Sequence, residues 1–194
     1  VKWACEPSRA QDVPRAIARA YFEAMTPPRG PTFVSIPVDD WDQDAEVVAP
    51  RTIATRNPGD PVAVSLVAAD LAAAQRPVLV LGAGVARDGA WQALIGLAER
   101  TGAAVYGAPM VSRNIFPETH SQFRGLLPAS REEILSLLEE YDVIASFGGP
   151  MNLYHVEGRG PHVPPAARIW LVGDNPGHLA CAPAGNAVVA DTRL

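Results

Sequence analysis

In the first 40 residues, apolar positions first recur with the period of a helix. They then form a short continuous run that is typical of a strand. Between residues 13 and 24 they stand at i, i+3, i+4 and i+7, which predicts an amphipathic helix. We expect Asp12 to cap this helix and Pro14 to occupy its first turn, where a missing N–H breaks no hydrogen bond. The β-rich stretch 32–36 predicts a short strand. A helix followed by a strand is half of an α/β unit.

Residues 43–59 lack a sustained apolar period and predict a linker. It begins within an acidic run at 39–46 and contains Pro50, Pro58 and Gly59. Carboxylates can bind hard cations, but this run lacks the central glycine and terminal glutamate of a calcium-binding loop. We therefore interpret it as a solvated connector.

From residue 60 onward, predicted helices and strands alternate regularly. The run Pro77–Leu81 is apolar at every position, which is typical of a parallel strand buried on both faces. Helices are predicted at 61–74, from 91 to near 102, from 131 through 138 after a capping box at Ser130–Glu133, and at 176–181; strands are predicted at 77–81, 103–106, 142–147, 168–172 and 187–190. This alternation predicts an α/β domain over residues 60–194, with a doubly wound, open and mostly parallel sheet of the Rossmann-like kind.

Composition and charge narrow the class of protein. Of the 194 residues, 48% are hydrophobic and 19% charged, as in ordinary globular proteins. The net charge is −5 and the 16 basic residues are scattered, which argues against nucleic acid as a partner. The longest apolar stretch, around 77–85, is too short to span a bilayer, and no signal peptide is evident, so we expect a cytoplasmic protein. Cys5 and Cys181 stand at opposite ends outside any CxxC pattern, so we interpret both as structural.

Three predicted loops lie where ligands bind open α/β sheets, beyond the carboxyl ends of the strands. The first, 82–87, offers Gly82 and Gly84 but has Arg87 where the dinucleotide motif has its third glycine. These glycines fit either a nucleotide phosphate at a helix N-terminus or a tight turn. The second loop, 109–129, is long enough to favour a function that its residue types do not specify.

The third loop, after residue 149, carries His155. Histidine exchanges protons near neutrality, so His155 is a candidate general acid or base, although a histidine in a loop can also be purely structural. His120, His162 and His178 are weaker candidates for the same work. No Ser/His/Asp order or HExxH spacing indicates a hydrolase.

Several segments of the chain carry a resemblance to a known family. They are Gly30–Pro37 followed by Asp-Asp-Trp-Asp at 39–42, Leu-Ala-Glu-Arg at 97–100, Phe-Arg-Gly-Leu at 123–126 and Tyr-His at 154–155. In order and spacing they resemble thiamin-diphosphate-dependent 2-oxoacid decarboxylases, and benzoylformate decarboxylases in particular. The first of them is similar to the end of that family's pyrimidine-binding domain, and the resemblance covers essentially the whole chain.

The resemblance implies a division of the chain and a role for His155. Residues 1–42 would be the last helix and strand of the pyrimidine-binding domain, 43–59 a linker and 60–194 the central domain. It implies thiamin diphosphate, Mg²⁺ or Ca²⁺ and a homotetramer in the parent enzyme, with His155 next to the reactive carbon of the cofactor. The residues after His155, at 156–160, differ from those expected of benzoylformate decarboxylases, which puts the substrate preference in doubt.

The parent enzyme implied by the resemblance would convert an aromatic 2-oxoacid such as benzoylformate into an aldehyde and carbon dioxide. The chain does not begin with Met and stops after a predicted strand, so we expect a piece of a longer protein. The glutamate that activates the cofactor and the motif that binds metal and diphosphate would lie outside it, so we expect the chain alone to be inactive. Two alternatives stay open: a central domain that binds FAD or ADP at Gly82 and Gly84, as in acetolactate-synthase-like enzymes, and a purely architectural domain.

Overall fold

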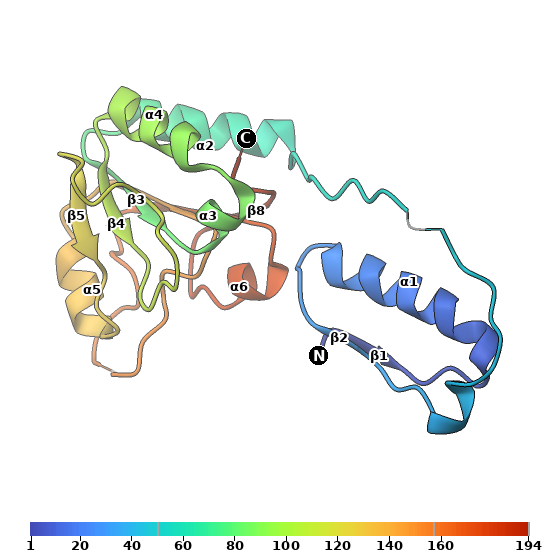
Figure 1. Cartoon of the computed structure of the whole chain (residues 1–194). Coiled ribbons are helices and arrows are strands. Elements are labelled where there is room, and N and C mark those ends of the chain that lie inside the picture. The colour runs from blue at the N-terminus through green and yellow to red at the C-terminus, as the bar shows by residue number, and fades with distance from the viewer. Residues whose placement is uncertain (50, 157, 194) are drawn as a thin grey trace. The chain divides into compact units, whose positions relative to one another are not determined.

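The computed structural model describes residues 1–49, 51–156 and 158–193, which form two compact units, Val1–Arg56 and Asn57–Leu194 (Figure 1). The first unit contains strand β1 (Trp3–Cys5), a 3-10 turn η1 (Ala10–Asp12), helix α1 (Val13–Met25), strand β2 (Thr32–Val34) and a 3-10 turn η2 (Val38–Asp40). β1 and β2 pair in parallel, with Trp3 opposite Thr32. Helix α1 and strand β2 were predicted from the sequence, whereas β1 was not.

The start of α1 differs from the prediction in one respect. Asp12 stands at the N-cap position, but its side chain makes no capping hydrogen bond. Its carboxylate instead accepts a hydrogen bond from Nε of Arg9 at 2.9 Å, and this ion pair lowers the pKa of Asp12 from its ordinary value. Asp12 is therefore the N-cap residue as predicted, but its carboxylate binds a nearby guanidinium and the capping hydrogen bond is not formed.

The second unit alternates helices and strands as the apolar pattern predicts. Its elements are α2 (Pro61–Ala73), β3 (Pro77–Leu81), α3 (Gly84–Asp88), α4 (Trp91–Thr101), β4 (Ala104–Gly107), β5 (Phe123–Leu126), α5 (Arg131–Leu138), β6 (Val143–Phe147), β7 (Arg168–Gly173), α6 (Pro176–Ala180) and β8 (Asn186–Val189). α2 begins as expected, since the Asp60 side chain accepts a hydrogen bond from the N–H of Val62. The capping box at α5 is not formed, because Ser130 makes no side-chain cap.

All six strands of this unit are parallel, in the order β5-β4-β3-β6-β7-β8. Renumbered from β3, this is the order 3-2-1-4-5-6 of doubly wound nucleotide-binding folds, which confirms the predicted fold class. Strand β5 corrects the prediction of one long loop over 109–129, because residues 123–126 add an edge strand beside β4. The short helix α3 was not predicted either.

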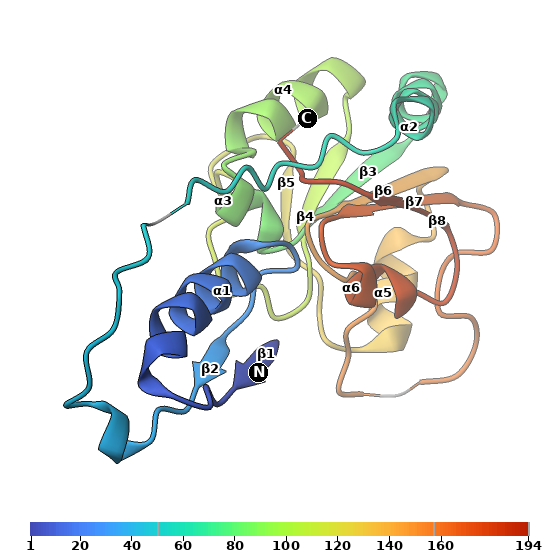
Figure 2. The same cartoon turned by 90° about the vertical axis from the view of Figure 1, so that its right-hand side faces the viewer.

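Helices cover both faces of the sheet (Figures 1 and 2). Helices α2, α3 and α4 pack on one face through an apolar cluster that includes Leu71, Val85 and Leu94. Helix α5 packs on the other face through Ile134 and Leu138. The central strands β3 and β6 are buried at every residue, as the unalternating apolar run at 77–81 predicts for β3.

Asp142 fastens the start of β6 to the turn between α2 and β3. Its carboxylate accepts hydrogen bonds from the N–H groups of Gln75 and Arg76 at 2.8 and 2.9 Å. Burial acts to raise the pKa of Asp142, but these backbone hydrogen bonds outweigh it and hold the pKa below its ordinary value. The carboxylate form therefore stabilises the fold at neutral pH.

We expect Asp142→Asn to lower the free energy of unfolding by about 1 to 2 kcal/mol at pH 7, because one N–H would face an amide NH₂ group. The folded-state pKa is depressed, so the contribution is complete above the unfolded value of about 3.9 and is lost as pH falls through the lower folded value. Urea unfolding of both proteins from pH 7 to pH 3 measures this. A difference in stability that persists undiminished at the acid end would contradict the assignment.

Candidate functional site

The strand order reverses between β3 and β6, so their carboxyl ends mark the place where doubly wound sheets bind ligands. Here the turn at Gly82–Gly84 meets the turn at Gly148–Gly149. The N–H of Gly84 donates to the carbonyl oxygen of Gly148 at 2.8 Å. A Cβ added to Gly82 would lie 2.6 Å from Cα of Gly149, and one added to Gly84 would lie 2.6 Å from the Gly148 oxygen. The two turns are therefore packed backbone against backbone.

Hydrogen bonds to residues that follow β7 and β8 hold helix α3 at the same edge of the sheet. Nη2 of Arg87 donates to the buried carboxylate of Asp174 at 2.6 Å, just beyond β7. The Asp88 carboxylate accepts hydrogen bonds from the N–H and hydroxyl of Thr192 at 3.1 and 2.9 Å. These contacts and the glycine packing give Gly82, Gly84 and Arg87 structural partners within the chain.

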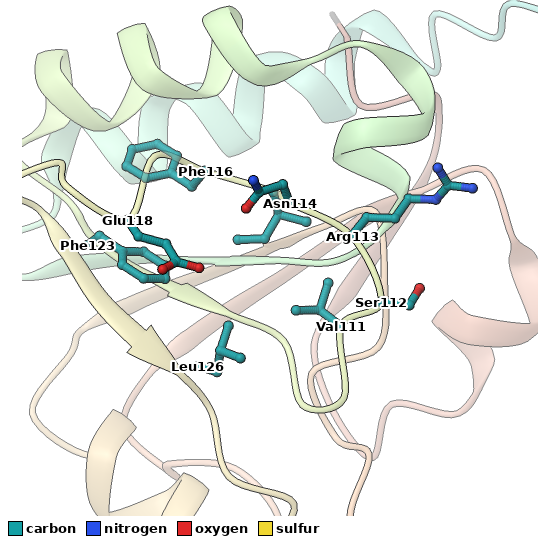
Figure 3. A pocket seen from close by; sticks show the side chains of 9 residues that line it. Val111, Ser112, Arg113, Asn114, Phe116, Glu118, Phe123 and Leu126 are labelled. Atoms are coloured by element: carbon teal, nitrogen blue, oxygen red, sulfur yellow. The ribbon is translucent and has the colours of Figure 1, made fainter.

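The segment before β5 forms a pocket of about 270 Å³ beyond β4 (Figure 3). Phe116, Phe123 and Leu126 contribute apolar side chains to its lining, and Arg113 points away from the two phenylalanines. Its full lining is Val111, Ser112, Arg113, Asn114, Ile115, Phe116, Glu118, Phe123 and Leu126. No predicted site residue lies among them.

His120 lies shortly after the lining residue Glu118 in the chain, and its ring contacts neighbouring side chains and backbone. Its ring packs edge-on against Phe116, with centroids 5.0 Å apart. Nδ1 of His120 accepts a hydrogen bond from the N–H of Gln122, and Nε2 lies 3.4 Å from the carboxylate of Glu99. These contacts favour the structural interpretation of His120.

His155 lies in the segment that follows β6 and is exposed to solvent. Its N–H donates to the carbonyl oxygen of Ala129 at 2.9 Å, and the N–H of Arg131 donates to the oxygen of Val156 at 3.3 Å. Ala129 stands between the end of β5 and the start of α5, so this contact places the His155 backbone at the carboxyl edge of the sheet. An imidazole exposed at this edge is open to a ligand.

Beside His155 lies a group of polar side chains that the sequence analysis did not bring together. The Tyr154 hydroxyl contacts Nδ1 of His162, and Nη1 of Arg131 lies 3.0 Å from Nε2 of the same ring. Nδ2 of Asn152 donates to the His162 carbonyl oxygen at 2.9 Å. No local spacing pattern indicates this group, because Arg131 and His162 are 31 positions apart in the chain.

The described residues contain no group of three or more His, Cys, Asp or Glu side chains arranged to hold a metal ion. No described helix is long and apolar enough to cross a membrane. Both cysteines are free, and Cys181 is exposed.

Comparison with known proteins identifies the family. The family model for the central domain of thiamine pyrophosphate (thiamin diphosphate) enzymes matches residues 64–194. This chain belongs to that family. The benzoylformate decarboxylase of Pseudomonas aeruginosa is 39% identical over 198 aligned positions, which cover 100% of this chain and 38% of that protein. The chain thus spans less than two fifths of the length of this curated relative.

Solved structures of thiamin diphosphate enzymes share the same fold. A putative thiamin diphosphate-dependent enzyme from Mycobacterium smegmatis matches with a TM-score of 0.95 and 38% identity. Benzoylformate decarboxylase from Polynucleobacter necessarius matches with a TM-score of 0.95 and 37% identity. Both matches cover 100% of this chain and 37% of the solved chain. The resemblance found in the sequence is confirmed, and the chain is a central domain of a thiamin diphosphate enzyme preceded by a short α/β segment.

Proposed function

We propose that the whole protein carrying this chain is a decarboxylase of an aromatic 2-oxoacid such as benzoylformate, which it converts into the aldehyde and carbon dioxide. The observation that carries the proposal is the 39% identity to a benzoylformate decarboxylase across the entire chain. As part of the proposal, the active enzyme uses thiamin diphosphate with Mg²⁺ or Ca²⁺, acts as a cytoplasmic homotetramer, and holds its cofactor through residues outside this chain. The 194-residue chain alone is then inactive.

We propose that His155 supplies the proton that this reaction consumes. Loss of carbon dioxide breaks the bond between the carboxyl carbon and the keto carbon, and the electron pair stays with the keto carbon. That carbon takes one proton before the aldehyde leaves, so the 2-oxoacid anion plus one proton gives the aldehyde plus carbon dioxide. An exposed imidazole on an anchored loop at the carboxyl edge suits a general acid.

The activity is tested with the full-length protein, benzoylformate and thiamin diphosphate with Mg²⁺. We expect benzaldehyde and carbon dioxide in equal amounts, and no product when the cofactor is withheld. A comparison of benzoylformate with pyruvate as substrates checks the aromatic preference. Turnover of pyruvate at a higher kcat/KM than benzoylformate would remove the aromatic assignment and keep only the cofactor class.

The alternative of an FAD or ADP site at Gly82 and Gly84 loses its main support, because both glycines are accounted for by contact with Gly148 and Gly149. We therefore expect purified full-length protein to show none of the visible absorbance of an oxidised flavin. Flavin that copurifies in a one-to-one ratio would restore the nucleotide hypothesis. The architectural alternative is addressed by the activity of His155 variants.

A further inference from the structure

The group formed by Arg131, His162 and Tyr154 is a chain of contacts that ends one residue before His155. Arg131 is the first residue of α5 and is only 9% exposed. Its guanidinium lies 3.0 Å from Nε2 of His162, whose Nδ1 contacts the Tyr154 hydroxyl. The Tyr154 and His162 rings lie 6.0 Å apart, centroid to centroid. One imidazole thus joins the start of α5 to the segment that carries His155.

The contacts assign the proton on His162. A guanidinium offers only N–H donors, so Nε2 of His162 must accept from Arg131 and carries no proton. The neutral ring then has its proton on Nδ1, and this N–H donates to the oxygen of Tyr154. Each member therefore has a fixed role as donor or acceptor, which defines the orientation of the Tyr154 side chain.

The orientation of Tyr154 bears directly on His155. Tyr154 is partly buried against the apolar cluster on the α5 face, whereas His155 is exposed. Backbone hydrogen bonds from His155 and Val156 to the Ala129 oxygen, and from Arg131 to the Val156 oxygen, hold the backbone of this segment at the sheet edge. The contact between Tyr154 and His162 adds a side-chain anchor on the residue directly before His155.

We propose that Arg131, His162 and Tyr154 form a positioning relay that sets the direction in which His155 projects. The effect of this relay on catalysis rests on the role proposed above for His155. A proton donor that is displaced by about 1 Å can lose about a hundredfold in rate. The relay residues do not touch substrate in this proposal. They act through His155 alone.

The kinetic test compares Tyr154→Phe and His162→Gln with Tyr141→Phe in the full-length enzyme. Tyr141 is a matched control, since it is a tyrosine partly buried against the same apolar cluster and paired with Tyr106 instead of the relay. We expect Tyr154→Phe to lower kcat about ten- to a hundredfold while KM changes less than about twofold. The Tyr141→Phe enzyme should keep its full kcat.

A double-mutant cycle separates positioning from general damage to the fold. In an enzyme that already carries His155→Ala, Tyr154→Phe should cause no further loss of kcat, because both changes remove the same correctly placed proton donor. A loss of the same size in both backgrounds would overturn the proposal. Equal kcat values for Tyr154→Phe and Tyr141→Phe would also overturn it.

NMR relaxation and imidazole ¹⁵N shifts test the relay independently of catalysis, so they still decide if His155 proves irrelevant to turnover. His162 should show the tautomer with its proton on Nδ1. The order parameter of the His155 side chain should fall in Tyr154→Phe and stay unchanged in Tyr141→Phe. A His162 proton on Nε2, or an unchanged order parameter in Tyr154→Phe, would reject the relay.

Discussion

The full-length enzyme with His155→Ala is expected to turn over benzoylformate about a hundred- to ten-thousandfold more slowly than the unmodified enzyme, the range that a positioned general acid contributes. The backbone of His155 is anchored to Ala129, and its side chain is exposed, so the substitution should remove the imidazole without disturbing the packing beneath it. Cofactor affinity should therefore stay nearly the same. Steady-state kcat and a titration with thiamin diphosphate measure the two effects.

His178→Ala supplies the matched control for this experiment. His178 is a second exposed histidine of the same unit, on the short helix α6, and has no role in the proposed reaction. Its variant should retain the unmodified kcat. Wild-type activity in His155→Ala would make the histidine dispensable and would favour a purely architectural role for this domain.

The largest effect on stability is expected for Gly84→Ala, at about 3 kcal/mol or more of lost free energy of unfolding. The added Cβ would stand 2.6 Å from the oxygen and 2.7 Å from Cα of Gly148. Both contacts are with backbone, which cannot rotate away as a side chain can. The turns after β3 and β6 would have to separate, and the hydrogen bond between Gly84 and Gly148 would be strained.

Gly96→Ala provides the opposite outcome in the same chain. Gly96 lies inside helix α4, and a Cβ added there meets nothing within 4 Å. Alanine should stabilise this helix by roughly 0.5 to 1 kcal/mol, because glycine loses more backbone entropy on folding. Urea unfolding of both variants checks the contrast. Equal stabilities would show that the two glycine turns are not packed as described.

The sequence predicts the sheet well because its strongest signal is local. The run Pro77–Leu81 has no polar residue, which predicts a strand buried on both faces. Strand β3 has the same bounds. Strand β5 was missed because Phe123–Leu126 is short and contains an exposed arginine and a glycine at φ +105°. Its place as an edge strand depends on pairing with β4, which the residues at 123–126 alone do not indicate.

The functional residues also divide into those that a local sequence signal indicates and those that depend on contacts made by the fold. The imidazole of His155 was singled out as a candidate proton donor, and its catalytic role stays a prediction. The sequence left both a phosphate loop and a tight turn open for Gly82 and Gly84, because the contact that accounts for them comes from Gly148, more than 60 positions away. His162 was given little weight, since its partners Arg131 and Tyr154 are joined to it only by the fold.

The most direct test of the central claim is a crystal structure of the full-length enzyme with thiamin diphosphate and a non-reactive benzoylformate analogue. We expect a ring nitrogen of His155 within about 3 Å of the analogue, or joined to it through one water molecule, as a proton donor requires. An imidazole of His155 that points into solvent, with another side chain occupying that position beside the analogue, would contradict the account.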